Sequence, residues 1–153
     1  MARYWRAWRV RLAIGLFSIS IVCLFWISNK PYGLTSDFLL QIVGFQGKVA
    51  LAVSLISGAI TAVLQRSFRA GGLVSLGVFF GAMVGGTVGL TSGLFVGEAM
   101  DRILPGSTDP YLPNLTAGLA GVAVWFFGQV IGAIWGGADW LDFYTSKHRD
   151  QVS

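Results

Sequence analysis

Six glycines recur at every fourth position of one long apolar segment. They are Gly77, Gly81, Gly85, Gly89, Gly93 and Gly97. Residues four apart lie on the same face of an α-helix, although each glycine in a helix interior costs about 1 kcal/mol relative to alanine. At 1.5 Å per residue the strip is about 30 Å long, which is the thickness of the hydrocarbon core of a bilayer. The strip therefore predicts a membrane-crossing helix that packs closely against another helix, because missing side chains let two backbones approach.

The composition agrees with a membrane protein. Hydrophobic residues make up 54% of the 153 residues and charged residues only 12%, whereas soluble domains carry about 25% charged residues. The mean hydropathy is +0.67. We therefore expect an all-α integral membrane protein in which residues 1–153 form a single membrane domain.

Four segments are predicted to cross the membrane, because each is apolar and close to the length of about 20 residues that spanning requires. They cover approximately residues 10–28, 48–64, 72–99 and 115–138. Between the first two, a short helix is predicted at about 36–45, lying in the membrane interface; one long bent helix over 36–64 is the alternative. Residues 1–9 and 139–153 are predicted to be polar tails on the cytoplasmic side.

The basic residues predict the orientation of the spans. Eight of the eleven would lie on one side: Arg3, Arg6, Arg9, Arg11, Arg66, Arg69, Lys147 and Arg149. Because basic residues accumulate on the cytoplasmic side, both termini are expected there. The membrane is expected to be a bacterial inner membrane or an organellar inner or thylakoid-type membrane. The basic and aromatic N-terminus is expected to contact anionic lipid and not nucleic acid.

Two further spans carry shorter stripes of small residues at the same spacing. The second has Ala50, Ser54, Gly58 and Ala62, and the fourth has Gly128, Gly132 and Gly136. These stripes could flank the third span within one chain. Alternatively, the strip of the third span could face an identical copy or a different subunit. The first span lacks a comparable stripe and is expected to pack peripherally.

Few polar side chains lie inside the predicted spans. Gln129, Thr87 and Thr91 are the intramembrane candidates, expected to hydrogen-bond between helices or to backbone carbonyls, with substrate contact as the less favoured role. Glu98 and Arg102 have the i, i+4 spacing of a surface ion pair. Asp139 and Asp142 lie near the end of the fourth span, where the helix dipole disfavours acids, and are candidates for contacting a partner.

No catalytic motif is present in the sequence. The single cysteine (Cys23) and the single histidine (His148, in the polar tail) offer no metal or cofactor site, so no catalytic residue, metal or cofactor is expected. We expect a non-enzymatic membrane subunit that docks through its glycine zipper into a larger complex or homo-oligomer. Its expected partners are membrane lipids and other membrane subunits or identical copies. The alternative is a small oligomeric channel or carrier, with the glycine strip of the third span lining the path.

Overall fold

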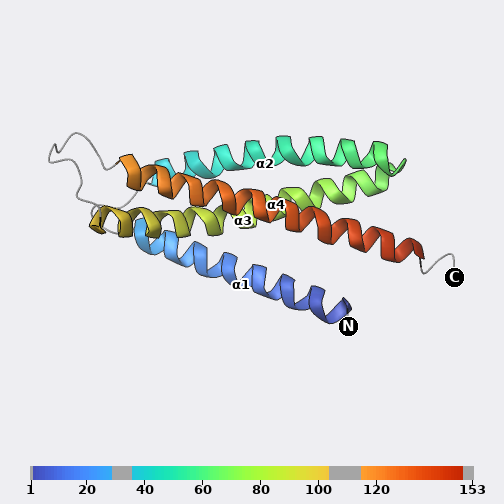
Figure 1. Ribbon diagram of the computed structural model, residues 1–153, viewed down its shortest axis with the longest axis horizontal. Coiled ribbons are helices and arrows are strands. Elements are labelled where there is room, and N and C mark those ends of the chain that lie inside the picture. The colour runs from blue at the N-terminus through green and yellow to red at the C-terminus, as the bar shows by residue number, and fades with distance from the viewer. Residues whose placement is uncertain (1, 29–35, 104–114, 150–153) are drawn as a thin grey trace.

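The computed structural model describes residues 2–28, 36–103 and 115–149, and nearly all of them are helical. The four α-helices are α1 (Ala2–Ser28), α2 (Ser36–Leu64), α3 (Phe68–Ile103) and α4 (Leu115–Arg149). Successive helices run in opposite directions. The start of α1, the turn between α2 and α3, and the end of α4 therefore lie at the same end of the bundle (Figure 1). The predicted all-helical architecture is confirmed for the part of the chain that the structure describes.

Three of these helices are long and apolar enough to cross a membrane. The segments are Leu40–Leu64, Phe68–Ile103 and Thr116–Ser146. The helix α1 differs, because its described apolar stretch, Arg11–Leu24, is shorter than the length of about 20 residues that spanning requires. Among the described residues, three helices are thus able to cross a membrane, and a fourth span stays a prediction.

The separate interfacial helix predicted at 36–45 is not present, because α2 runs without interruption from Ser36 to Leu64. The prediction relied on Gly44 and Gly47 to turn the chain, but neither glycine has a positive φ. A helix tolerates such glycines at a cost of about 1 kcal/mol each. Between them, the side chain of Gln46 is buried against α3 and holds this part of α2 in the bundle. The alternative of one long helix is the one that the structure contains.

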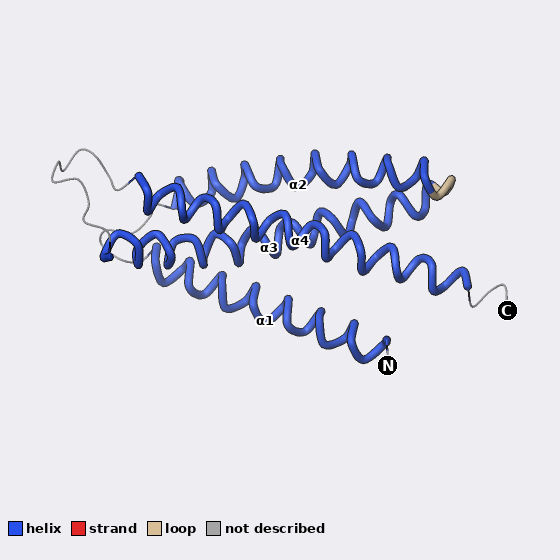
Figure 2. The backbone as a smooth tube through the Cα atoms, viewed as in Figure 1, coloured by secondary structure: helices blue, strands red, loops and turns tan. Residues whose placement is uncertain are grey.

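The helix α3 is the centre of the bundle. The helices α2 and α4 both pack along it, and α1 packs mainly on α3 as well. The contact of α1 lies in its C-terminal half, where Thr91 Oγ1 donates to the carbonyl of Ser20 at 3.4 Å. Towards its N-terminus α1 diverges from α3 and α4 (Figure 2). The angle between α1 and the other helices leaves an opening along one side of the bundle.

The turn between α2 and α3 is short, and its backbone groups are paired at both helix ends. The N–H of Ser67 bonds to the carbonyl of Ala62 at 3.0 Å, and the N–H of Arg66 bonds to that of Val63 at 3.2 Å. This is the Schellman arrangement, which needs a left-handed residue after the helix, and Arg66 has a φ of 48°. Ser67 Oγ then caps α3 by accepting from the N–H of Ala70 at 3.3 Å. The turn thus fixes α2 and α3 as an antiparallel hairpin.

Replacing Arg66 by glycine is expected to stabilise the hairpin, because a non-glycine residue in the left-handed region costs about 1 kcal/mol or more. The midpoint of thermal unfolding in detergent micelles should rise. Arg66→Ala is the matched control, since it removes the same charge but keeps the strained backbone. Equal midpoints for the two variants would contradict this account of the turn.

Candidate functional site

The glycine strip of α3 lies against α4 of the same chain. A methyl group added at Gly89 would lie 2.8 Å from the carbonyl oxygen of Trp125, closer than real side chains approach. At four further positions of the strip, the added group would collide with the carbonyl of a glycine in α4. The facing pairs are Gly77–Gly136, Gly81–Gly132, Gly85–Gly128 and Gly93–Gly121. Gly97 leaves slightly more room, because a methyl group added there would lie 3.2 Å from the carbonyl oxygen of Ala117. Backbone therefore faces backbone over most of the length of the strip.

Another face of α3 receives the small residues of α2. Ala50 and Ser54 are buried, each only 1% exposed. A methyl group on Gly58 would meet the carbonyl of Gly71 at 2.8 Å, and one on Gly71 would meet the side chain of Ala62 at 2.6 Å. The small residues predicted in the second and fourth spans therefore flank α3 from two sides within one chain.

A polar cluster joins α2, α3 and α4 near the middle of the bundle. Gln46 of α2 is 1% exposed. Its Nε2 donates to the carbonyl of Met83 at 2.9 Å, and its Oε1 accepts from Trp125 Nε1 at 3.3 Å. The Nε2 of Gln129 donates to the backbone carbonyl of Gln46 at 3.3 Å. Each of these groups has a partner inside the protein, which matters because an unpaired polar group is costly where no water can reach it.

The two threonine candidates, Thr87 and Thr91, hydrogen-bond to backbone carbonyls of α3. Thr87 Oγ1 donates to the carbonyl of Met83 at 2.9 Å, one turn back along the helix. Thr91 Oγ1 donates to the carbonyl of Thr87 at 3.0 Å and lies 3.4 Å from that of Ser20 in α1. Thr91 is only 6% exposed. Thr87, Thr91 and Gln129 therefore all donate to backbone carbonyls.

Gln46 was missed by the sequence analysis, although it is the central member of the polar cluster. The predicted second span began at residue 48, which placed Gln46 in a turn at the membrane surface. A signal for it exists in Gly86, which lies outside the four-residue register of the strip. A methyl group there would lie 2.6 Å from Gln46 Cδ, so Gly86 provides the space that the amide occupies.

Ion pairs join described residues at both ends of the bundle. Glu98 Oε1 accepts from Arg102 Nη2 at 2.6 Å on the exposed surface near the end of α3, as their spacing in the sequence predicts. At the opposite end, Arg9 Nη1 of α1 donates to Asp139 Oδ1 of α4 at 2.9 Å. Asp139, considered above as a contact for another protein, is therefore paired within the chain.

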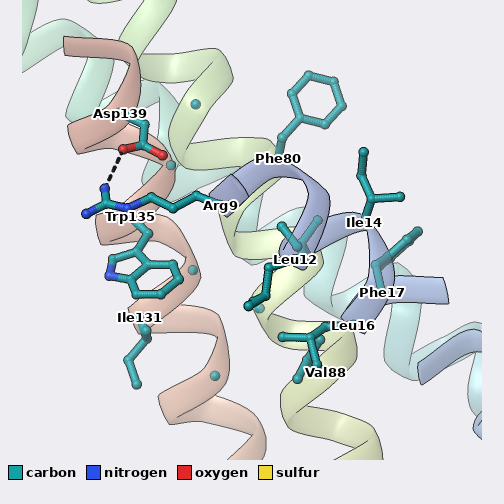
Figure 3. A pocket seen from close by; sticks show the side chains of 18 of the residues that line it. Arg9, Leu12, Ile14, Leu16, Phe17, Phe80, Val88, Ile131, Trp135 and Asp139 are labelled. Atoms are coloured by element: carbon teal, nitrogen blue, oxygen red, sulfur yellow. Dashed lines mark hydrogen bonds and ion pairs between the residues drawn. The ribbon is translucent and has the colours of Figure 1, made fainter. Parts of the chain in front are cut away.

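An apolar groove of about 670 Å³ lies between α1 and the α3–α4 pair. The Arg9–Asp139 pair lies at one end of it, and the guanidinium of Arg9 is 5.9 Å from the centre of the Trp135 ring. Figure 3 shows apolar side chains of all three helices around the opening. Gly81, Gly85 and Gly132 are among the residues that line it. The edge of the glycine strip thus forms part of the groove wall.

No group of three or more histidine, cysteine, aspartate or glutamate residues is close enough to bind a metal ion in residues 2–28, 36–103 and 115–149. Comparison with protein-family models, with curated proteins and with solved structures found no match to this chain. The site must therefore be interpreted from its own contacts.

Alanine at Gly132 is expected to destabilise the protein by about 2 kcal/mol, because its methyl group would collide with backbone atoms of α3, which have little freedom to move. Alanine at Gly118 of the same helix has open space around it, so it should gain up to about 1 kcal/mol from better helix propensity. Thermal unfolding in detergent compares the two variants. If both variants shift stability in the same direction, the close approach of α3 and α4 is not what the glycines provide.

The bond between Trp125 and Gln46 can be measured with a double-mutant cycle. Gln46→Leu keeps the approximate size of the side chain but leaves the indole N–H of Trp125 without its acceptor. Trp125→Phe removes that N–H. Hydrogen bonds between membrane helices contribute about 0.6 kcal/mol on average, so the two substitutions should couple by about that amount or more. Strictly additive free energies of unfolding would show that the bond contributes nothing.

Proposed function

We propose that this chain is a non-enzymatic integral membrane subunit with a structural role in a larger membrane assembly. In this proposal the glycine contacts between α3 and α4 form a glycine zipper that holds the subunit itself together. All four helices cross the membrane, with both termini on its cytoplasmic side. The assembly partners are other membrane subunits or identical copies of the chain.

The observation that carries this proposal is the inward pairing of the polar groups in the middle of the bundle. Gln46 and Gln129 are 1% and 7% exposed and bond to groups of neighbouring helices. A transport path or catalytic site needs polar groups that face a cavity and remain available to a substrate. Here the described cluster ties helices together instead.

The outer surface is where partners must bind, since the glycine strip is occupied within the chain. Large apolar side chains are exposed there, for example Leu55 and Ile60 of α2 and Phe127 and Ile134 of α4. In a bilayer such surfaces can face lipid or another membrane helix equally well. We therefore assign docking to the outer faces of α2 and α4, and assign the zipper to internal stability.

The alternative of a channel or carrier has less support. It requires the glycine strip to line a path, but the strip lies against α4 and contributes one edge to the apolar groove beside α1. The groove beside α1 is lined almost wholly by apolar side chains, with Arg9 and Asp139 at one end. An ion or polar solute would find no replacement for its hydration shell along such a wall.

Native mass spectrometry of the protein, gently extracted from its own membrane, tests the proposal. We expect one defined complex, either with other membrane proteins or of identical copies. Gly85→Leu and Gly89→Leu should each reduce the amount of that complex severalfold, because neither side chain fits between α3 and α4. Val84→Leu and Leu90→Ile are controls that should leave it unchanged.

Two results would overturn the proposal. One is a monomer in the native membrane extract, which would leave no assembly for the chain to support. The other is a solute flux through liposomes that contain only this protein, abolished by Gln129→Leu, which would establish a transport role.

A further inference from the structure

The groove beside α1 lies towards the end of the bundle where α1 begins, between Arg9 and the contact of α1 with α3. It extends along α3 from Gly77 to Val88, which is about 17 Å at 1.5 Å per residue. Beyond Val88, α1 packs onto α3, and both Ser20 and Thr91 are buried there. Half of the hydrocarbon core of a bilayer is about 15 Å thick. The groove therefore has the depth of one leaflet.

The lining of the groove divides into an apolar wall and a polar mouth. The wall consists of aliphatic and aromatic side chains from α1, α3 and α4, together with glycine backbone. Representative members are Leu12, Phe17, Phe80, Val84 and Ile131. At the mouth lie Arg9, Asp139 and Trp140. Charged and tryptophan side chains together are typical of headgroup depth, so the apolar wall begins where the acyl region of the leaflet would begin.

We propose that this groove binds one phospholipid of the surrounding leaflet, with an acyl chain along the apolar wall and the phosphate beside Arg9. The proposal rests on the membrane placement of the subunit given above. A volume of about 670 Å³ is within the range of about 300–1,000 Å³ found for small-molecule sites. Because the groove is as deep as one leaflet, an acyl chain bound along it ends near the middle of the bilayer.

The depth also argues against a second protein helix as the occupant. A transmembrane helix is about 10 Å wide and must cross both leaflets. In this groove it would meet the contact between Ser20 and Thr91 halfway across. An acyl chain belongs to one leaflet and therefore ends at that depth. It is also flexible enough to fill a groove of irregular width.

The mouth of the groove has a suitable group for a phosphate. The side chain of Arg9 is 41% exposed and bonds to Asp139, whose side chain is 30% exposed. A guanidinium has five N–H donors and pairs well with phosphate oxygens. Arg11, two residues on, lies on a different face of α1 and does not line the groove. Asp139 is the carboxylate that lines the groove from α4. The phosphate therefore takes its place on the α1 side of the mouth.

Native mass spectrometry of the purified protein tests the site with phosphatidylglycerol as the probe and diacylglycerol of the same acyl chains as the comparison. The wild type should retain one phosphatidylglycerol. Val84→Trp should abolish retention by filling the groove, whereas Ile60→Trp, on the exposed outer face of α2, should retain it. Ala13→Phe fills the groove from α1 and replaces Val84→Trp if that variant fails to fold.

Arg9→Gln tests the headgroup contact separately. It should weaken retention of phosphatidylglycerol by about fivefold, the factor expected for one basic residue facing an anionic lipid, and leave diacylglycerol unchanged. Arg9→Lys should restore most of the difference.

Unchanged lipid retention in both groove-filling variants would overturn the proposal, as would the finding that these variants lose a second copy of the chain instead of a lipid. Failure of the two proposals can be told apart. A protein that assembles in its own membrane but retains no lipid contradicts only the lipid site. A monomer that retains one lipid contradicts only the structural role.

Discussion

The close approach of the α3 and α4 backbones is the contact on which the bundle depends. In lipid, two helices gain no hydrophobic stabilisation from meeting, because acyl chains are as apolar as leucine side chains. Association must come from van der Waals contact, and the glycine carbonyls of one helix lie directly against the glycines of the other. The helix α4 covers one face of α3 and the small residues of α2 cover another, while Leu76 and Phe80 of α3 stay exposed.

A strip with a period of four residues brings two helices together but leaves their register open, since a shift by one turn places glycine opposite glycine again. The polar cluster removes this ambiguity. Gln46 fits beside Gly86, and its amide bonds to α3 and α4 at the same time. A shift of either neighbour would leave buried amide or indole groups without partners, which is costly in an apolar environment. The glycines let the helices approach closely, and the hydrogen bonds of Gln46 favour one register between them.

The sequence predicts those features that repeat along a helix. Apolar length predicts the helices, and the four-residue spacing identifies the faces of α2, α3 and α4 that meet. Features that depend on a single distant partner are not encoded in any spacing. The pair of Arg9 and Asp139 joins opposite ends of the sequence. Gln46 was excluded because the predicted span began at residue 48, whereas the apolar segment of α2 begins at Leu40. The groove depends on the tilt of α1, which no residue pattern specifies.

The attachment of α1 has a consequence for biosynthesis. This helix is synthesised before the helices that receive it. Thr91 of α3 contacts its C-terminal half, and Asp139 of α4 pairs with Arg9 near its start. Until α4 is synthesised, the ion pair of Arg9 with Asp139 cannot form. The contacts that attach α1 to the bundle are therefore completed only after α4 has been made, although α1 precedes α4 in the chain.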